Sequence, residues 1–453
     1  MIDLVVRGGT VATPAGVRVA DVAIDGGRIL EVREGLVAEA AEVIDASDLH
    51  VLPGVIDVHT HVRLSDAEHP DRFEQDMRSA AAGGTTTVLT FNNPGTGISV
   101  AGAGSLLAGL DEFTARTASG SPIDFGLSAV VTGQQPRALE ELPELIARGV
   151  PTFKAFMVYD FAFPDAKLPA LLATAARHGG MLQLHCEDRE IIDPLVAAAL
   201  DRGDVGPRHH ATTRPVTAEA TATRRAIELA RRADAPLYIV HLSSEAALEA
   251  VAEAKARGEP VYAETCPHYL TLTDALYADP DEREVMKRVI SPPLRGQGDV
   301  DALWGALRDG ILDVVGSDHV PDRIDTEKRL PAPPFPEISN GAPGIETLLS
   351  VVFSDGVATG RIGLERLVEV LAASPARLFG LGAKGAIEAG RDADLVIWDP
   401  AAQRTIRQSG LIHTSDFTPY EGREVTGRPV TVLSRGRRTD GMRGRFLRRE
   451  LQA

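Results

Sequence analysis

Eight short runs of apolar and β-branched residues alternate with stretches whose apolar residues recur at helical spacing, and this alternation restricts the fold most strongly. In chain order the runs are GVIDVHTHV, TTTVLTFNN, IDFGLSAVV, PTFKAFMVY, MLQLHCE, LYIVHLSS, PVYAETCPHYL and ILDVVGSDH. Strands that alternate with helices form parallel sheets, and eight such units close into a barrel with functional side chains at the C-terminal strand ends. The sequence therefore predicts an α/β fold, a (β/α)₈ TIM barrel over residues 53–385.

The two ends of the chain have a different texture from the middle. Residues 1–52 and 386–453 carry short alternating runs separated by Gly-Gly and Asp-Gly turn signals, which are typical of antiparallel strands. A chain of 453 residues has room for one large barrel and a smaller second domain. We expect the two ends to pair into a small β-sandwich domain.

Composition narrows the classes of function. A net charge of −17 argues against nucleic acid and anionic membranes as partners. No apolar run approaches the ~20 residues of a membrane span, and the N-terminus lacks the features of a signal peptide, so we expect a cytoplasmic protein. Cys186 and Cys266 are too few for a disulfide framework and are expected to be small buried residues. The arginine-rich end, SRGRRTDGMRGRFLRRE, is interpreted as a solvated tail or a subunit contact rather than a basic binding arm.

Metal-ligating residue types stand at the ends of five of the predicted barrel strands. Side chains i and i+2 of a strand point to the same face, so His59 and His61 point together. Each residue alone has a structural explanation, but their joint occurrence at one end of the barrel predicts a metal site. The candidate ligands are His59, His61, Lys154, His185, His241 and Asp318.

The chemistry of these side chains indicates the kind of metal centre. Imidazole and carboxylate favour Zn²⁺, with Mn²⁺, Co²⁺ or Fe²⁺ as alternatives. Six ligands are too many for one tetrahedral ion and suit two ions about 3.5–4 Å apart that share bridging ligands and a hydroxide. Lys154, flanked by Phe153 and Phe156 and facing two cations, should lose its proton. A neutral amine can add carbon dioxide, which would make Lys154 an N6-carboxylated, bridging ligand.

Several motifs occur in one order along nearly the whole chain, namely HTH, FKAFM, HCED, VHLSS, ETCPHYL, SPPLR, SDH, NGAPGIE and SPARLFGLGAKGAIEAGRDADLVIWDP. Together they resemble the cyclic amidohydrolases, nearest the hydantoinase and dihydropyrimidinase branch. The resemblance implies His59, His61 and Asp318 on one metal ion, His185 and His241 on the other, and carboxylated Lys154 between them.

The resemblance also implies a reaction, the hydrolysis of the cyclic amide of a hydantoin or dihydropyrimidine to an N-carbamoyl amino acid. A hydroxide held between two metal ions would attack the amide carbonyl, and Asp318 would carry its proton to the departing ring nitrogen. Tyr159 matches the family tyrosine that donates a hydrogen bond to the developing oxyanion. By the same analogy, Ser291 and Asn340 would bind the –NH–CO–NH– edge of the ring.

Some features depart from typical hydantoinases. The segment after the strand-one histidines, RLSDAEHPDRFEQD, is charged, and Arg63 together with Asn92 or Asn93 resembles the residues that hold the substrate carboxylate in dihydroorotases. Dihydroorotase or allantoinase activity is therefore the alternative. A non-catalytic dihydropyrimidinase-like scaffold protein is a third reading, which the complete ligand set opposes. Family analogy implies a homotetramer or homodimer.

Four further histidines lie near these motifs or in the loops. His268 and His319 are expected to support the site rather than to bind metal, and His209 and His210 are expected to be solvated.

Overall fold

A nearly closed barrel forms the centre of the molecule. The computed structural model describes residues 1–92, 104–118, 120–329 and 331–451. In this part of the chain the barrel sheet has eight parallel strands, ordered in sequence so that each pairs with the next. These strands are β6 (Val55–Thr60), β7 (Thr85–Phe91), β8 (Asp124–Val130), β9 (Thr152–Phe156), β10 (Met181–His185), β11 (Leu237–Ile239), β12 (Val261–Thr265) and β13 (Val314–Val315). The His61 amide donates to the His319 carbonyl at 2.8 Å, which joins the first strand end to the last.

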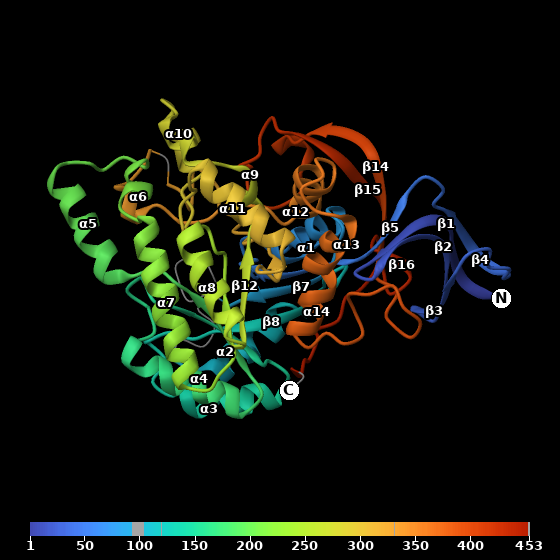
Figure 1. Cartoon of the computed structure of the whole chain (residues 1–453), viewed down its shortest axis with the longest axis horizontal. Helices are drawn as coiled ribbons and strands as arrows, with labels where there is room; N and C mark the ends of the chain where they lie inside the picture. The colour runs from blue at the N-terminus through green and yellow to red at the C-terminus, as the bar shows by residue number, and fades with distance from the viewer. Residues whose placement is uncertain (93–103, 119, 330, 452–453) are drawn as a thin grey trace.

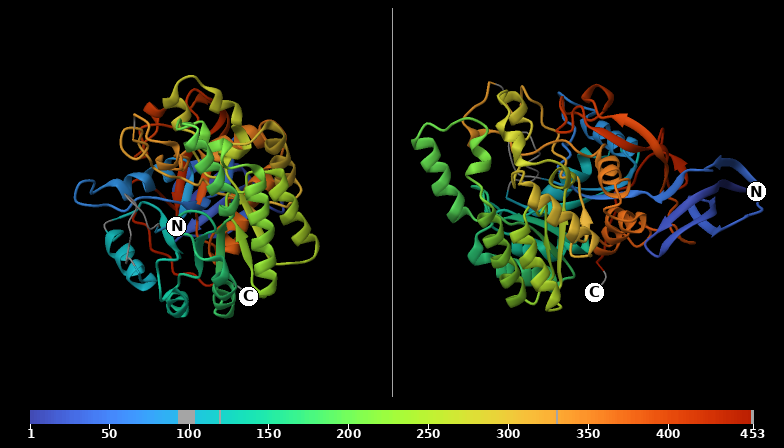
Figure 2. Two further views of the ribbon diagram at one scale, coloured as in Figure 1. Left: turned by 90° about the vertical axis from the view of Figure 1, so that its left-hand side faces the viewer. Right: turned by 45° about the horizontal axis from the view of Figure 1, so that its top comes forward.

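Helices surround the barrel strands (Figure 2). Those that connect successive strands or follow the last one are α1 (Arg72–Ala82), α2 (Leu106–Arg116), α3 (Ala138–Ala147), α4 (Leu168–Arg177), α7 (Val216–Arg232), α8 (Glu245–Ala256), α11 (Gln297–Arg308), α12 (Leu348–Val352), α13 (Leu364–Val368) and α14 (Ser374–Leu378). Shorter insertions add α5 (Arg189–Asp201), α6 (His209–Thr212), α9 (Pro267–Thr271) and α10 (Glu282–Met286).

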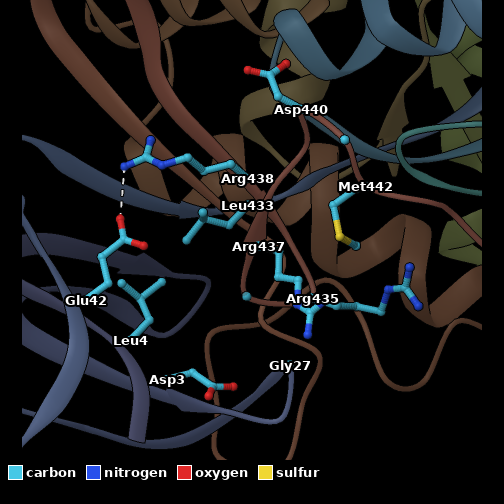
Figure 3. A pocket seen from close by; sticks show the side chains of 12 residues that line it. Asp3, Leu4, Gly27, Glu42, Leu433, Arg435, Arg437, Arg438, Asp440 and Met442 are labelled. Carbon is cyan, nitrogen blue, oxygen red and sulfur yellow. Dashed lines mark hydrogen bonds and ion pairs between the residues drawn. The ribbon is translucent and has the colours of Figure 1, made fainter.

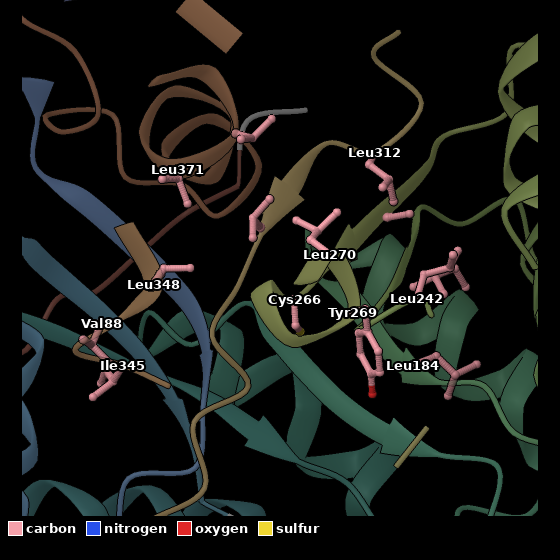
Figure 4. Close-up of a cluster of buried hydrophobic side chains, with 14 of the residues drawn as sticks. Val88, Leu184, Leu242, Cys266, Tyr269, Leu270, Leu312, Ile345, Leu348 and Leu371 are labelled. Carbon is pink, nitrogen blue, oxygen red and sulfur yellow. The ribbon is translucent and has the colours of Figure 1, made fainter. Parts of the chain in front are cut away.

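The hydrophobic core fills the layer between the strands and these helices. Figure 4 shows part of it, where Leu184, Leu242 and Leu270 lie close to Cys266 and Tyr269. Both cysteines are buried and free, as the sequence predicts. The strand ends that carry the candidate ligands are thus held by a continuous apolar layer.

The two ends of the chain form a second, mixed sheet with eight strands among the described residues, and Figure 1 shows its N-terminal strands standing away from the barrel. It contains β1 (Ile2–Thr13), β2 (Gly16–Asp25), β3 (Arg28–Arg33), β4 (Ala40–Asp45), β5 (His50–Pro53), β14 (Leu395–Thr405), β15 (Glu424–Ser434) and β16 (Arg437–Arg438). β1, β2 and β3 are antiparallel as expected, whereas β4 and β5 run parallel to β1. β5 pairs with β14, so the predicted joining of the two ends is confirmed.

Residues 445–449 of the arginine-rich C-terminal segment pack against the barrel, so the expectation of a solvated tail is wrong there, and the other expectation, a subunit contact, stays a prediction. The Phe125 amide at the start of β8 donates to the Arg445 carbonyl, and the Leu447 amide donates to the Phe125 carbonyl. Arg449 is buried and donates to the carbonyls of Leu127 and Phe379. This segment therefore lies at the N-terminal ends of the strands, away from the ends that carry the candidate site.

A hollow of about 460 Å³ lies where the terminal sheet meets the segment after β15, lined by Arg435, Arg437 and Arg438 with Asp3 and Glu42 (Figure 3). It contains none of the predicted metal ligands.

Among the described residues, no helix combines the length and apolar character needed to cross a membrane.

Candidate active site

Five of the six predicted metal ligands lie at or just beyond the C-terminal ends of barrel strands, Lys154 lies in the middle of β9, and all six are buried. The Nε2 atoms of His59 and His61 lie 3.0 and 3.2 Å from Oδ1 of Asp318. The rings of His185 and His241 are 4.5 Å apart, and those of His59 and His241 are 5.3 Å apart. Lys154 Nζ lies 3.5 Å from His59 Nε2. Residues that are up to 259 positions apart in sequence thus form one cluster.

The protonation states of this cluster suit metal binding. Burial lowers the pKa of His61 to about 4, and it also lowers the pKa values of His185 and His241. Burial opposes the ionisation of Asp318, but the contacts with His59 and His61 hold its pKa well below its usual range. His61, His185 and His241 are therefore neutral and Asp318 is ionised, which are the forms that bind metal ions. Burial also opposes the charged form of His59, but Glu264 and Asp318 raise its pKa above the usual value.

Lys154 is buried beside two aromatic rings, that of Phe156, which the sequence predicts, and that of Phe91 on β7. Its Nζ lies 4.9 Å from the centre of the Phe91 ring and 5.2 Å from that of Phe156. Burial lowers the pKa of this amine to about 8, with Asp318 opposing the change. The neutral amine that carboxylation requires is consequently accessible near neutral pH.

Two buried carboxylates contact the rings of His59 and His185, and the sequence analysis did not identify either of them. Glu264, on β12, contacts Nδ1 of His59 and accepts a hydrogen bond from the Tyr238 hydroxyl at 2.7 Å. Glu187 lies 2.8 Å from Nε2 of His185 and is itself paired with Arg214. Such carboxylates fix the orientation of ligand imidazoles and raise their basicity. Their position inside the ETCPHYL and HCED motifs was the available signal.

Local backbone geometry directs three of the predicted site residues. Tyr159, His241 and Asp318 have φ angles of 80°, 40° and 48°, in the left-handed region that non-glycine residues rarely adopt. Such conformations are concentrated at functional sites, where the surrounding structure enforces them. Gly316 allows the last strand to approach the first, because a Cβ there would lie 2.9 Å from the His59 Cβ.

Tyr159, Ser291 and Asn340, the residues assigned to the substrate ring and its oxyanion, lie close together. Burial raises the pKa of the Tyr159 hydroxyl, and the nearby side chains of Ser291 and Asn340 lower it in part. Asn340 Oδ1 is buried and has no hydrogen-bond partner among the described residues. A polar pocket edge with unused hydrogen-bonding capacity therefore lies beside Tyr159.

His210 was expected to be solvated, and this expectation is wrong. His210 is 2 % exposed. Its Nε2 lies 3.0 Å from the Ile290 carbonyl oxygen and 3.2 Å from Ser291 Oγ. The docking of α6 onto the segment before Ser291 buries this ring, which the polar composition of the loop did not indicate.

Arg63 forms ion pairs with two carboxylates of the protein itself. One of its terminal nitrogens lies 2.6 Å from Oδ1 of buried Asp322, and the other contacts Glu327. Asn92 Oδ1 accepts a hydrogen bond from the Val130 amide at 2.9 Å, which ties the ends of two strands. Asn93 lies outside the described residues. This arrangement speaks against Arg63 as the partner of a substrate carboxylate, because two protein carboxylates already neutralise it.

His268 and His319 take up different positions around the cluster. His319 Nδ1 accepts a hydrogen bond from the Gly344 amide at 3.1 Å, so this ring supports the loop that follows Asn340. His268 is buried against Tyr269, and its ligand atom lies within 4.8 Å of those of Cys266 and Asp318. Neither placement contradicts the supporting roles expected for them.

The residues present fit a metal centre. The ligand atoms of His59, His61 and Asp318 lie within 4.8 Å of one another and are all buried. In addition, Nδ1 of His61 and Nδ1 of His241 are buried without a hydrogen-bond partner among the described residues. A buried imidazole nitrogen without a partner is costly unless a ligand or water satisfies it. The donor set, imidazoles with a carboxylate, favours zinc among the common ions.

Comparison with known proteins gives a consistent result. Residues 50–439 match the model of the amidohydrolase family. The chain is 40% identical to a D-hydantoinase of Streptomyces coelicolor over 444 residues, which cover 95% of this chain and 93% of the relative. A D-hydantoinase of Ralstonia pickettii is 39% identical over 441 residues, covering 96% and 94% of the two chains. Among solved structures, a dihydropyrimidinase from Brevibacillus agri superposes with a TM-score of 0.92 at 38% identity, with 99% of each chain covered.

Proposed function

The chain belongs to the amidohydrolase family, and on that premise we propose that it hydrolyses the cyclic amide bond of a hydantoin or dihydropyrimidine to an N-carbamoyl amino acid. The carrying observation is the position of Tyr159, Ser291 and Asn340. These residues bring hydrogen-bonding groups together at the mouth of a barrel that also holds a buried cluster of metal-ligand types. A cyclic –NH–CO–NH– edge needs donors and acceptors of this kind beside a hydrolytic centre.

We assign the metal ligands as the sequence predicts. His59, His61 and Asp318 would hold one divalent ion, His185 and His241 a second, and N6-carboxylated Lys154 both, with zinc as the expected metal. When bound, the two ions supply Lewis-acid polarisation of the ring carbonyl and a water that is acidic enough to attack it near neutral pH.

The chain's own residues perform the remaining steps. The Asp318 carboxylate accepts the proton of the attacking water and passes it to the ring nitrogen as the C–N bond breaks. The Tyr159 hydroxyl donates a hydrogen bond to the carbonyl oxygen as negative charge develops there, and burial keeps this hydroxyl protonated. Ser291 and Asn340 hold the ring edge and so fix the carbonyl in front of Tyr159.

Dihydroorotase or allantoinase activity is the second candidate. This hypothesis depends on Arg63, together with Asn92 or Asn93, as the residues that bind a substrate carboxylate. The ion pairs of Arg63 with Asp322 and Glu327 weaken the hypothesis. A non-catalytic scaffold role is opposed by the complete set of ligand types at the barrel mouth. Assembly into a homodimer or homotetramer stays a prediction, which light scattering after gel filtration would test.

The test is a substrate panel on the zinc-loaded protein, with the metal-stripped protein and Asp318→Asn as controls. The panel contains hydantoin, dihydrouracil, both enantiomers of a 5-substituted hydantoin, allantoin and dihydroorotate, and products are identified by mass spectrometry. Formation of N-carbamoyl products from the hydantoins or dihydrouracil would support the proposal. Turnover of dihydroorotate or allantoin alone would replace it by the second candidate, and inactivity of the loaded protein on every ring would favour the scaffold.

A further inference from the structure

One buried lysine, Lys328, contacts both segments that carry the assigned ring-binding residues. It is completely buried, and its Nζ donates to the carbonyls of Val289 at 2.9 Å, Ser339 at 2.7 Å and Gly341 at 2.7 Å. Val289 precedes Ser291 by two positions, and Ser339 and Gly341 stand on either side of Asn340. A single ammonium group therefore joins the two segments at the point where each presents its polar side chain.

The geometry matches the donor capacity of lysine. An ammonium has three N–H donors in a tetrahedral arrangement, and here it meets three carbonyl oxygens. The planar guanidinium of arginine could not point to three acceptors in this arrangement. Oδ2 of Asp322, at 3.8 Å, supplies the opposite charge that a buried cation needs.

The two segments also have contacts that do not involve Lys328, since Val289 and Ile338 belong to one cluster of buried apolar side chains. The Gly341 amide donates to the Val289 carbonyl at 3.0 Å, so this carbonyl accepts from Gly341 as well as from Lys328. Gly341 also packs closely on Val320, because a Cβ there would lie 2.4 Å from Cγ2 of Val320. Without Lys328, the carbonyls of Ser339 and Gly341 would lose a buried donor, and the spacing between Ser291 and Asn340 would depend on the amide contact and on apolar packing alone.

We propose that Lys328 is a positioning residue that fixes the spacing of Ser291 and Asn340 and thereby sets the affinity for the cyclic substrate. The proposal rests on the function proposed above for Ser291 and Asn340. Among the described residues, Lys328 forms no hydrogen bond or ion pair with the assigned metal ligands. It acts through the two main-chain segments, whose buried carbonyl oxygens it saturates.

The experiment compares Lys328→Met with a matched control, Arg366→Met. Arg366 is also a cation that donates to two main-chain carbonyls, those of Leu307 and Leu312, but these lie before β13 at the opposite end of the barrel. Both variants are measured as zinc-loaded protein for metal content, kcat and KM on the ring that the wild type hydrolyses best, and hydrogen exchange of peptides across the chain.

For Lys328→Met we expect KM to rise at least about tenfold with metal content unchanged, because uniform binding of the ring is lost while the ligands stay in place. Hydrogen exchange should accelerate in the peptides that contain residues 289–292 and 339–342. Arg366→Met should leave KM within about twofold of the wild type. Lys328→Gln, which keeps two donors, should fall between the wild type and Lys328→Met.

Three results would overturn the proposal. They are an unchanged KM in folded Lys328→Met, an equal rise of KM in Arg366→Met, and failure of both Lys328 variants to fold, which would make the residue a requirement of the fold. A wild type that is inactive on every ring would instead refute the proposed function. In that case local exchange at the two segments alone decides whether Lys328 holds them together.

Discussion

Replacing Arg63 by alanine separates a structural role from a substrate-binding one. The guanidinium is 4% exposed and pairs with Asp322, which is fully buried, and with Glu327, which is 17% exposed. Removal of Arg63 leaves both carboxylates without their main partner. Asp322 keeps Lys328 at 3.8 Å and the nearby Ser339 side chain. Glu327 keeps the Arg323 guanidinium at 3.5 Å and accepts hydrogen bonds from the Arg323 amide at 2.9 Å and from the Thr326 hydroxyl. The variant thus creates an incompletely compensated buried charge.

The expected cost follows from this burial. Breaking a buried ion pair by removing one partner costs about 3–5 kcal/mol, and the remaining contacts place Arg63→Ala near the lower end of that range. An unfolding entropy of about 2.1 cal/mol/K per residue over 453 residues converts about 3 kcal/mol into a fall in Tm of about 3 °C. If Arg63 is structural, kcat/KM should change by the same factor for dihydrouracil and for dihydroorotate.

The assay combines thermal unfolding with kinetics on these two rings. Arg323→Ala is the control, since Arg323 is another arginine on Glu327 but is 32% exposed, so its loss should cost less than about 1 kcal/mol. The reasoning is refuted if Arg63→Ala leaves Tm unchanged and selectively abolishes turnover of dihydroorotate. That outcome would mean that the arginine leaves its carboxylates to bind the substrate.

Three further changes test other parts of the structure. Tyr159→Phe should lower kcat by a factor of about 10²–10³ with little change in Tm, because it removes one donor to the developing oxyanion and keeps the aromatic ring. Steady-state kinetics check this, and an unaltered kcat would remove Tyr159 from the mechanism. Lys154→Ala should reduce the amount of bound zinc, measured by elemental analysis. The intact-protein mass of the variant should lack the carbon dioxide that is added to the wild type. Full metal occupancy in the variant would contradict a bridging role for Lys154. Phe446→Ala should lower the free energy of unfolding by about 2 kcal/mol, because packing on Phe113 and Phe125 is lost, and it should leave KM unchanged. Denaturant titration measures the stability, and a value equal to that of the wild type would show that the C-terminal segment does not pack on the barrel in solution.

The barrel could be predicted from the sequence because its strands are nearly continuous apolar runs, which differ in period from the helices between them. Residues at the C-terminal ends of parallel strands lie at the same rim of a barrel, independent of the details of packing. The candidate ligands were identified from their positions at the ends of these runs. Glu264 was missed because it stands inside the ETCPHYL motif, where the pattern alone does not show that its carboxylate faces His59.

The contacts made by loops could not be predicted in the same way. Arg63 and Asp322 are 259 positions apart, and Lys328 binds carbonyls of Val289 and Gly341 that no side-chain pattern marks. His210 and the C-terminal segment were misjudged for a related reason. Polar composition predicts solvation only when no other element covers the segment, and that depends on the finished fold.

The backbone shows why strand alternation explains only part of the site. His59 belongs to β6 and His61 follows directly after it, and their ring centres are 5.5 Å apart, as the two-residue period predicts, although the pairing of β6 with β7 shifts register between Asp57 and Thr60. Tyr159, His241 and Asp318 follow the ends of β9, β11 and β13 and turn there into left-handed conformations, each of which costs roughly 1–2 kcal/mol for a residue with a Cβ. A strand continued through these positions would place their side chains by alternation, without the turn that the structure shows. The surrounding barrel therefore sustains a local conformation that is unfavourable for these residues in isolation. It does so at the residues proposed as the proton-transfer group, a metal ligand and the oxyanion donor, where small displacements would matter most for the proposed reaction.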